Sequence, residues 1–135
     1  MANLTVVAAD VAPVRVIEQF TGPCAEAITA GQVVRIDTST GMFTFANAST
    51  AAEGRALGVA IESGIAGQTI TVVAQGLVDL GDALTDQTYD ETLRLSNTDG
   101  ALDDGAGTPT GTYNIGRVFP AWGAVTADKI LLVEL

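Results

Sequence analysis

Short β-prone runs separated by turn-forming residues constrain the fold of this chain more than any other feature. Gly, Asp, Asn, Ser and Thr stand between these runs, and helical periodicity is found only at Pro23–Ile28, which is too short for an independent helix. The predicted strands are Val14–Phe20, Val33–Ile36, Met42–Phe45, Leu57–Ile61, Thr69–Ala74, Leu77–Leu80, Leu93–Leu95, Ile115–Phe119 and Ile130–Leu135. This pattern predicts an all-β fold, a small single-domain barrel or sandwich with little helix.

The segment from Val33 to Phe45 is predicted to form a hairpin. Polar residues closed by Gly41 stand between two apolar runs, and glycine supplies the positive φ that such loops need. Asp37 and Thr38 carry side-chain oxygens that can cap the turn.

The second half of the chain repeats this plan, which indicates two pseudo-symmetric hairpin-plus-strand units at residues 30–76 and 89–135. The alternative is that strands and glycine turns resemble one another by chance. The matching segments are Val34–Phe43 with Leu93–Leu102, Leu57–Ala60 with Ile115–Val118, and Ile70–Val73 with Ile130–Val133. The polar stretches Ala46–Arg55 and Asp103–Gly111 are expected to be corresponding surface loops.

The composition excludes most catalytic mechanisms. The chain has no histidine and a single lysine, so it lacks the commonest general base and every histidine-activated nucleophile. We therefore expect that it is not an enzyme and that it has neither catalytic residues nor a cofactor. Cys24 is the one cysteine and is expected to be a small buried apolar residue.

The net charge of −10 argues against direct binding to nucleic acid or to an acidic membrane surface. No apolar run approaches the length of a membrane span, and the first residues lack the pattern of a signal peptide. We therefore expect synthesis in the cytoplasm of the cell that makes the protein.

Acidic residues concentrate between positions 79 and 104. Half of the 16 acids lie there, namely Asp79, Asp82, Asp86, Asp90, Glu91, Asp99, Asp103 and Asp104. No EF-hand loop is present, so a solvated acidic face is the expected explanation and a calcium site is the alternative. No metal ligand is assigned.

Two segments are candidates for contact with another protein or another subunit. Leu4, Val6 and Val7 lie in residues 1–20, which we predict to be an N-terminal arm preceding a β domain at residues 21–135. Phe119 and Trp122 form the most distinctive aromatic cluster, and tryptophan often anchors interfaces. The alternative for Trp122 is a plug at one end of a barrel.

The order and spacing of these segments resemble those of tailed-bacteriophage capsid decoration, or cement, proteins. The resemblance covers residues 30–135 and includes the lambda-type head-stabilising proteins and related short cement proteins. It is carried by Ala30-Gly31, Asp37–Gly41, Ala56–Ala60, Thr69–Ala74, Gly76–Val78, Gly81–Leu84, Leu93–Leu95, Ile115–Val118 and Ile130–Leu135.

The resemblance implies a β domain on the outer surface of the virion capsid, bound to the phage major capsid protein and bridging its subunits. It also implies a homo-oligomer, a trimer with a dimer as the alternative. An N-terminal arm that becomes ordered on the capsid is expected, and Leu4–Ala8 is apolar enough to add a strand to a capsid edge.

Two other functions remain open from the sequence. One is a structural component of a phage tail, baseplate or fibre. The other is a small β module that binds carbohydrate or peptide, which would need an exposed aromatic platform.

Overall fold

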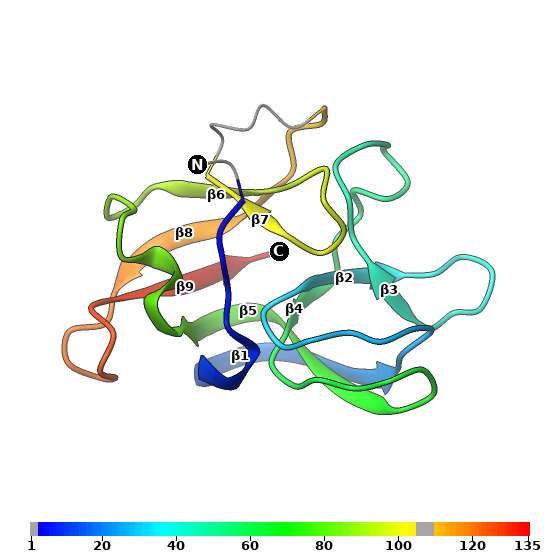
Figure 1. The fold of residues 1–135 in the computed structure, drawn as a ribbon, viewed down its shortest axis with the longest axis horizontal. Helices are drawn as coiled ribbons and strands as arrows, with labels where there is room; N and C mark the ends of the chain where they lie inside the picture. Colours follow the sequence, from blue (N-terminus) through cyan, green and yellow to red (C-terminus); the bar gives the residue numbers. More distant parts are fainter. Residues whose placement is uncertain (1–2, 105–109) are drawn as a thin grey trace.

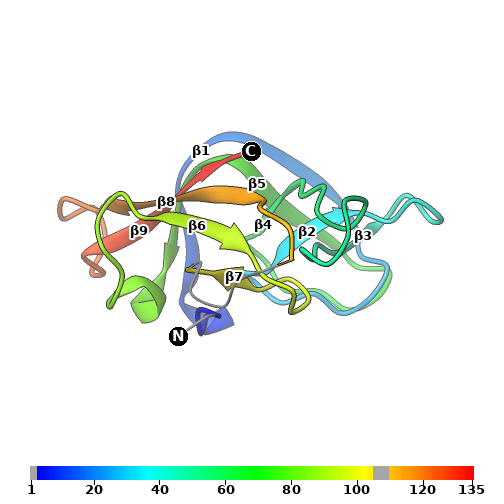
Figure 2. The same ribbon diagram turned by 90° about the horizontal axis from the view of Figure 1, so that it is seen from above.

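Nine strands form one antiparallel sheet that curls into a half-barrel within residues 3–104 and 110–135, the part of the chain that the computed structural model describes (Figures 1 and 2). The all-β prediction is confirmed. The elements are η1 (Ala8–Asp10), β1 (Val11–Pro23), β2 (Val33–Ile36), β3 (Phe43–Phe45), β4 (Gly58–Ala60), β5 (Thr69–Leu80), η2 (Gly81–Leu84), β6 (Thr92–Leu95), β7 (Leu102–Asp103), β8 (Asn114–Pro120) and β9 (Lys129–Glu134).

β5 is the central strand of this sheet. Hydrogen-bonded neighbours follow the order β3-β2-β4-β5-β9-β8-β6-β7, and β1 also pairs with β5. Val72 and Val73 pair with both β1 and β4, whereas residues 75–78 pair with both β1 and β9. Because a strand has two edges, β1 occupies one edge of β5, and β4 and β9 share the other. Figure 1 shows β1 below β5, with β9 and β4 above it at opposite ends.

A bulge in β5 lies where its partner changes from β4 to β9. Glu18 pairs with Gln75 and Gln19 pairs with Val73, so Ala74 is an extra residue opposite β1. Such a bulge changes which face of the sheet the following side chains occupy. Val72 accordingly belongs to a smaller apolar core on one face, and Val78 belongs to the larger core on the other.

The strands β2–β5 and β6–β9 have the same pairing scheme. Corresponding pairs are Arg35–Thr44 with Arg94–Asp103, Val34–Gly58 with Leu93–Gly116, and Ala60–Val72 with Val118–Leu131. Residue numbers in the second set exceed those in the first by 58 or 59. The offset of 60 predicted for the last strands is therefore wrong by one residue. Gly41 and Gly100 also correspond, with φ values of 71° and 70°.

The two halves differ in how their faces are covered. One face of the first half contributes Val34, Phe43, Ala60, Ile70 and Val72 to the smaller core, where Cys24 and Ile28 cover it. The opposite face contributes Val33, Val59 and Val73 to the larger core. The first half is thus buried on both sides, which explains its continuous apolar runs.

The second half is buried on one side only. Its counterparts of the smaller-core residues, Leu93, Leu102, Val118 and Leu131, line the larger core. The counterparts of Val33, Val59 and Val73 are Thr92, Arg117 and Leu132, which are half-buried or exposed. The larger core therefore brings together two faces that do not correspond in the repeat. The first half contributes its Val33 face, and the second half contributes the face that corresponds to the smaller-core face of the first.

Several local predictions need correction. The predicted strands Thr69–Ala74 and Leu77–Leu80 are one strand, β5. The segment Pro23–Ile28 is not helical, because Cys24 and Ile28 instead form isolated bridges with Phe43 and Gly64. The stretch Ala46–Arg55 is not wholly a surface loop, since the small side chains of Ala46 and Ala48 are buried. Residues 105–109 of the corresponding second loop lie outside the described residues.

The Val33–Phe45 hairpin is confirmed. The backbone N–H of Ser39 donates to Asp37 Oδ1 at 2.8 Å, so the aspartate caps the turn. Cys24 is fully buried, as expected, and burial raises the pKa of its thiol.

Gly58 and Gly116 occupy the same position in the two halves for one steric reason. A Cβ on Gly58 would lie 2.8 Å from the carbonyl oxygen of Val73, and a Cβ on Gly116 would lie 1.9 Å from that of Leu132. The adjacent strand therefore approaches too closely at either position to admit a side chain.

We predict that Gly116→Ala lowers the free energy of unfolding by about 3 kcal/mol, because the backbone of β9 must move. Gly41→Ala is the control, since Gly41 has open space around its Cβ position and bears only the cost of a positive φ, about 1 kcal/mol. Urea unfolding would measure both. Equal losses would contradict the steric explanation.

Candidate protein interface

The predicted N-terminal arm is largely part of the domain. Leu4 is buried in the larger core, and its N–H donates to the Leu102 carbonyl oxygen at 2.9 Å. Val6 packs partly against the same core, whereas the Val7 side chain is 55% exposed. Of the three candidate arm residues, only Val7 is exposed at the surface. The expected boundary between residues 20 and 21 falls within β1, which runs without a break from Val11 to Pro23.

The outer edge of β1 is free, because β5 is its one strand partner within the described residues. Proline stands near each end of this edge, at Pro13 and Pro23, and between them the register of pairing with β5 shifts. Prolines and bulges protect an edge against continuous pairing with another chain. A partner at β1 would therefore contact mainly side chains.

A bulge in β1 exposes an aliphatic side chain. Val16 pairs with Gly76 and Glu18 with Gln75, so Ile17 is an extra residue, and its side chain is 65% exposed. Bulges often re-aim a side chain in this way. Phe20 lies farther along the strand and is also exposed. We call Val16, Ile17 and Phe20 the β1 surface.

Trp122 is presented by a tight turn between β8 and β9. Its φ is +49° and that of Gly123 is +81°, and the Ala124 N–H donates to the Ala121 carbonyl oxygen at 3.0 Å. Two central residues with positive φ are typical of a type I′ turn, where Asn and Gly are preferred and a bulky residue is strained. The side chain is 81% exposed, so Trp122 is not a plug in the barrel.

Phe119 supports Trp122 from the end of β8. The two rings meet edge to face, with their centroids 5.2 Å apart. This contact restricts the indole on one side and leaves the rest of it at the surface. We call Phe119 and Trp122 the aromatic tip.

Tyr89 and Lys129 lie at the same end of the sheet. The hydroxyl of Tyr89 donates to the Asp128 carboxylate, which raises the pKa of the phenol. Lys129 Nζ lies 5.1 Å from the Tyr89 ring centre and donates to the carbonyl oxygen of Gln87 at 2.6 Å. These contacts hold the loop before β6 against the start of β9.

Arg117 joins the same loop to the outer face of the sheet. Its guanidinium forms ion pairs with Glu134 and with Asp90, each at 2.6 Å, and these two carboxylates raise the pKa of Arg117. Asp90 has a φ of +66° and corresponds to Gly31 in the first half, whose φ is +93°. All three groups face solvent, so the network contributes little to stability, and its main role is to position the loop before β6 against the sheet.

Much of the acidic stretch has structural partners. Asp79 accepts from the Gly81 N–H, and Asp99 accepts from the Asn47 side chain, each at 2.8 Å. Asp103 is buried. No group of three or more Cys, Asp or Glu residues in the described ranges is arranged to hold a metal ion. Several of these acids thus serve the fold and do not form the purely solvated face that we expected.

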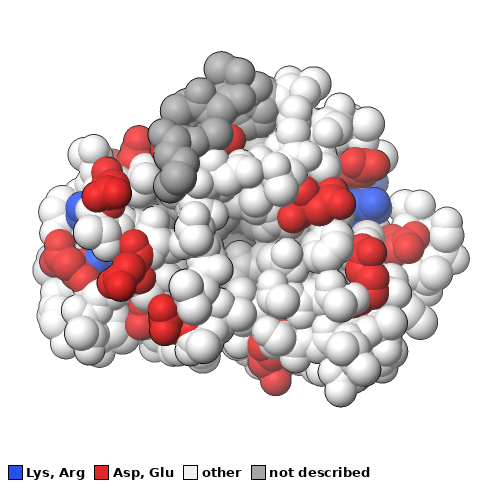
Figure 3. Space-filling view, viewed as in Figure 1, with Lys and Arg blue, Asp and Glu red and all other residues white. Residues whose placement is uncertain are grey.

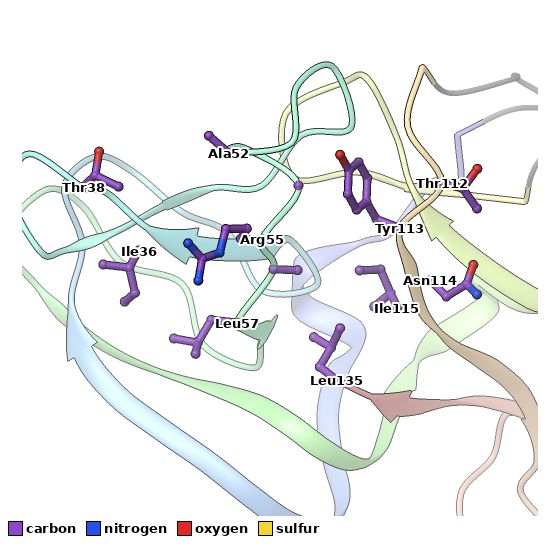
Figure 4. A pocket seen from close by; sticks show the side chains of 12 residues that line it. Ile36, Thr38, Ala52, Arg55, Leu57, Thr112, Tyr113, Asn114, Ile115 and Leu135 are labelled. Atoms are coloured by element: carbon purple, nitrogen blue, oxygen red, sulfur yellow. The ribbon is translucent and has the colours of Figure 1, made fainter.

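A concave site lies where β4 and β9 meet end to end along β5. It has a volume of about 800 Å³ and opens between the two halves of the sheet (Figure 4). We call it the split-sheet pocket. Its apolar lining includes Leu57 just before β4, Leu135 just after β9, Ile36 and Ile115, and its polar lining includes Arg55, Tyr113, Thr38, Thr112 and Asn114. This site could not be predicted from the sequence, because it depends on how strands distant in sequence converge on β5.

Two glycines fix the Tyr113 ring beside this pocket. A Cβ on Gly54 would lie 2.4 Å from the ring, and a Cβ on Gly111 would lie 2.2 Å from it. The ring is therefore clamped between two stretches of backbone. One wall of the pocket is a rigid aromatic surface.

The charges of the aromatic tip and the pocket are opposite. Acidic side chains are spread over the ends of the face in Figure 3, where basic ones are few. Acids near the aromatic tip are Asp86, Asp90, Glu91 and Asp128, and they outnumber the bases Arg117 and Lys129 there. The described residues that line the pocket include no acid, and the Arg55 side chain makes no ion pair or hydrogen bond with them.

Comparisons with protein-family models, curated proteins and solved structures found no match to this chain. Among the described residues, no helix is long and apolar enough to cross a membrane.

We predict that the free energy of unfolding is about 1 kcal/mol higher for Trp122→Asn than for Trp122→Ala. Both variants lose the indole, but Asn tolerates the positive φ that strains Ala. Urea unfolding of the two variants side by side measures the difference. Equal stabilities would show that the turn does not impose strain at residue 122.

Proposed function

We propose that the chain is a structural virion protein that decorates the outside of a tailed-phage head and stabilises it by bridging major capsid protein subunits. The observation that carries the proposal is the β1 surface, a set of exposed apolar side chains along a free strand edge. The prolines and bulges of β1 protect its backbone against strand pairing, so it is the exposed aliphatic and aromatic side chains that favour a protein partner.

The order and spacing of the strands support a capsid as this partner, through the resemblance to cement proteins. An adhesive role also suits a chain that lacks histidine. Decoration requires only weak individual contacts, since many copies bind a symmetric shell and bridging contacts add by avidity.

Binding to heads tests the proposal directly. Purified protein would be co-sedimented with expanded heads from the same genome that lack this gene product. We expect saturable binding at a fixed ratio to the major capsid protein, and heads that survive a higher temperature once decorated. A folded protein that does not bind expanded heads would overturn the proposal and direct attention to tail components and glycans.

A matched pair of variants tests the β1 surface. Ile17→Asp is expected to weaken head binding by about tenfold or more, because it places a charge in an apolar contact. Ile65→Asp is the control, since Ile65 is 64% exposed on a turn outside β1. Circular dichroism would verify that both variants fold. Equal binding by the two variants would remove β1 from the contact while leaving decoration itself intact.

A further inference from the structure

We infer that the aromatic tip of one copy of this chain binds in the split-sheet pocket of a second copy. This contact goes beyond the proposed function, because it joins decorating subunits to one another and leaves the β1 surface free for the capsid.

The tip has the properties of an interface anchor. Trp122 is 81% exposed, its turn has a strained positive φ, and Phe119 holds the ring from one side. Strain of this kind persists where a side chain must be held in a particular direction. Tryptophan in such a position commonly contributes a large share of binding energy.

The pocket has the complementary properties. A volume of about 800 Å³ is ample for one indole, and the lining offers aliphatic side chains on one side and the clamped Tyr113 ring on the other. Figure 4 shows Arg55 among these side chains, beside Ile36 and Leu57. A guanidinium without an ion pair can stack on an indole, where the cation is attracted by the ring.

Charge favours a second copy as the occupant. The pocket carries Arg55 and no acidic side chain, although the chain has 16 acids and only 6 basic residues. The end of the sheet that bears Trp122 carries the acids Asp86, Asp90, Glu91 and Asp128 and the bases Arg117 and Lys129, so four negative charges face two positive ones. An acidic tip approaching a basic pocket is attracted, and the remaining acidic surface disfavours other orientations.

The tip cannot fill the pocket of its own chain. β8 connects them, with Asn114 at the pocket and Pro120 next to the turn, so they are separated by about 20 Å of strand. The contact is therefore between different patches on two molecules. Such a head-to-tail contact closes into a ring if the rotation allows it and otherwise continues as a chain.

A complementation experiment tests this contact. Trp122→Asn removes the anchor and suits the turn, whereas Ile36→Glu combined with Arg55→Glu spoils the pocket at two exposed positions. We expect the wild type to self-associate as its concentration rises in sedimentation velocity. Each variant alone should associate at least about thirtyfold more weakly.

An equimolar mixture of the two variants should form one-to-one dimers and nothing larger. The Trp122→Asn protein contributes an intact pocket, the other variant contributes an intact tip, and no further contact is available. Failure of the mixture to dimerise, or full assembly of either variant alone, would overturn the inference. A wild type that stays monomeric at all concentrations would also overturn it.

Intrinsic fluorescence provides a second readout, because Trp122 is the single tryptophan. Its emission should shift to shorter wavelength as copies associate and the indole leaves water. Emission that does not shift while the protein assembles would show that another surface joins the copies. Head binding by Ile17→Asp is measured separately, so the proposed function and this contact can fail independently.

Discussion

The pairing of β5 along both of its edges holds the structure together. One edge carries β1, and the other carries β4 and then β9, so the two halves of the chain meet on a single strand. The bulge at Ala74 lets β5 serve both halves, because it turns the side chains before and after it toward different cores. Gly76 follows the bulge and has no room for a side chain against the β1 backbone.

The internal repeat explains both the burial and the sites. β1 pairs with the edge of β5 that faces away from β4, and β5 likewise pairs with the edge of β9 that faces away from β8. The second half is therefore joined to the first in the way that the first is joined to β1. In the first half, both faces are covered. In the second, Arg117 replaces Val59 at the corresponding position, and the outer face ends in a solvated ion-pair network. In proteins built from repeats, a terminal repeat with a polar outer face prevents a further repeat from packing on it.

The strands and the hairpin could be predicted from the sequence because local signals specify them. Alternating apolar residues and the glycine at position 41 depend only on their near neighbours. The repeat was also visible, although its last offset was wrong, since Ile70 and Ile130 resemble each other without being equivalent. The Pro23–Ile28 error has a tertiary cause: Cys24 and Ile28 cover the second face of the first half, and local periodicity carries no information about that face.

The residues of the candidate interface also divide into those that the sequence could indicate and those that depend on tertiary structure. Trp122 was identified because it lies in the most distinctive aromatic cluster of a chain with few aromatic residues, whereas its exposure depends on the turn that the structure shows. Leu4 was predicted to lie in an arm but is part of the larger core, and an apolar residue at such a position in the sequence is compatible with either. Ile17 and the split-sheet pocket were missed, because one depends on a bulge and the other on the meeting of β4 and β9 along β5.

The sharing of β5 also bears on how the chain folds. β1 and β5 lie some fifty residues or more apart at their pairing positions, and so do β5 and β9. Neither half has a complete set of strand partners without the other. Folding should therefore be slow and all-or-none, because most of the contacts that complete the sheet join residues distant in sequence.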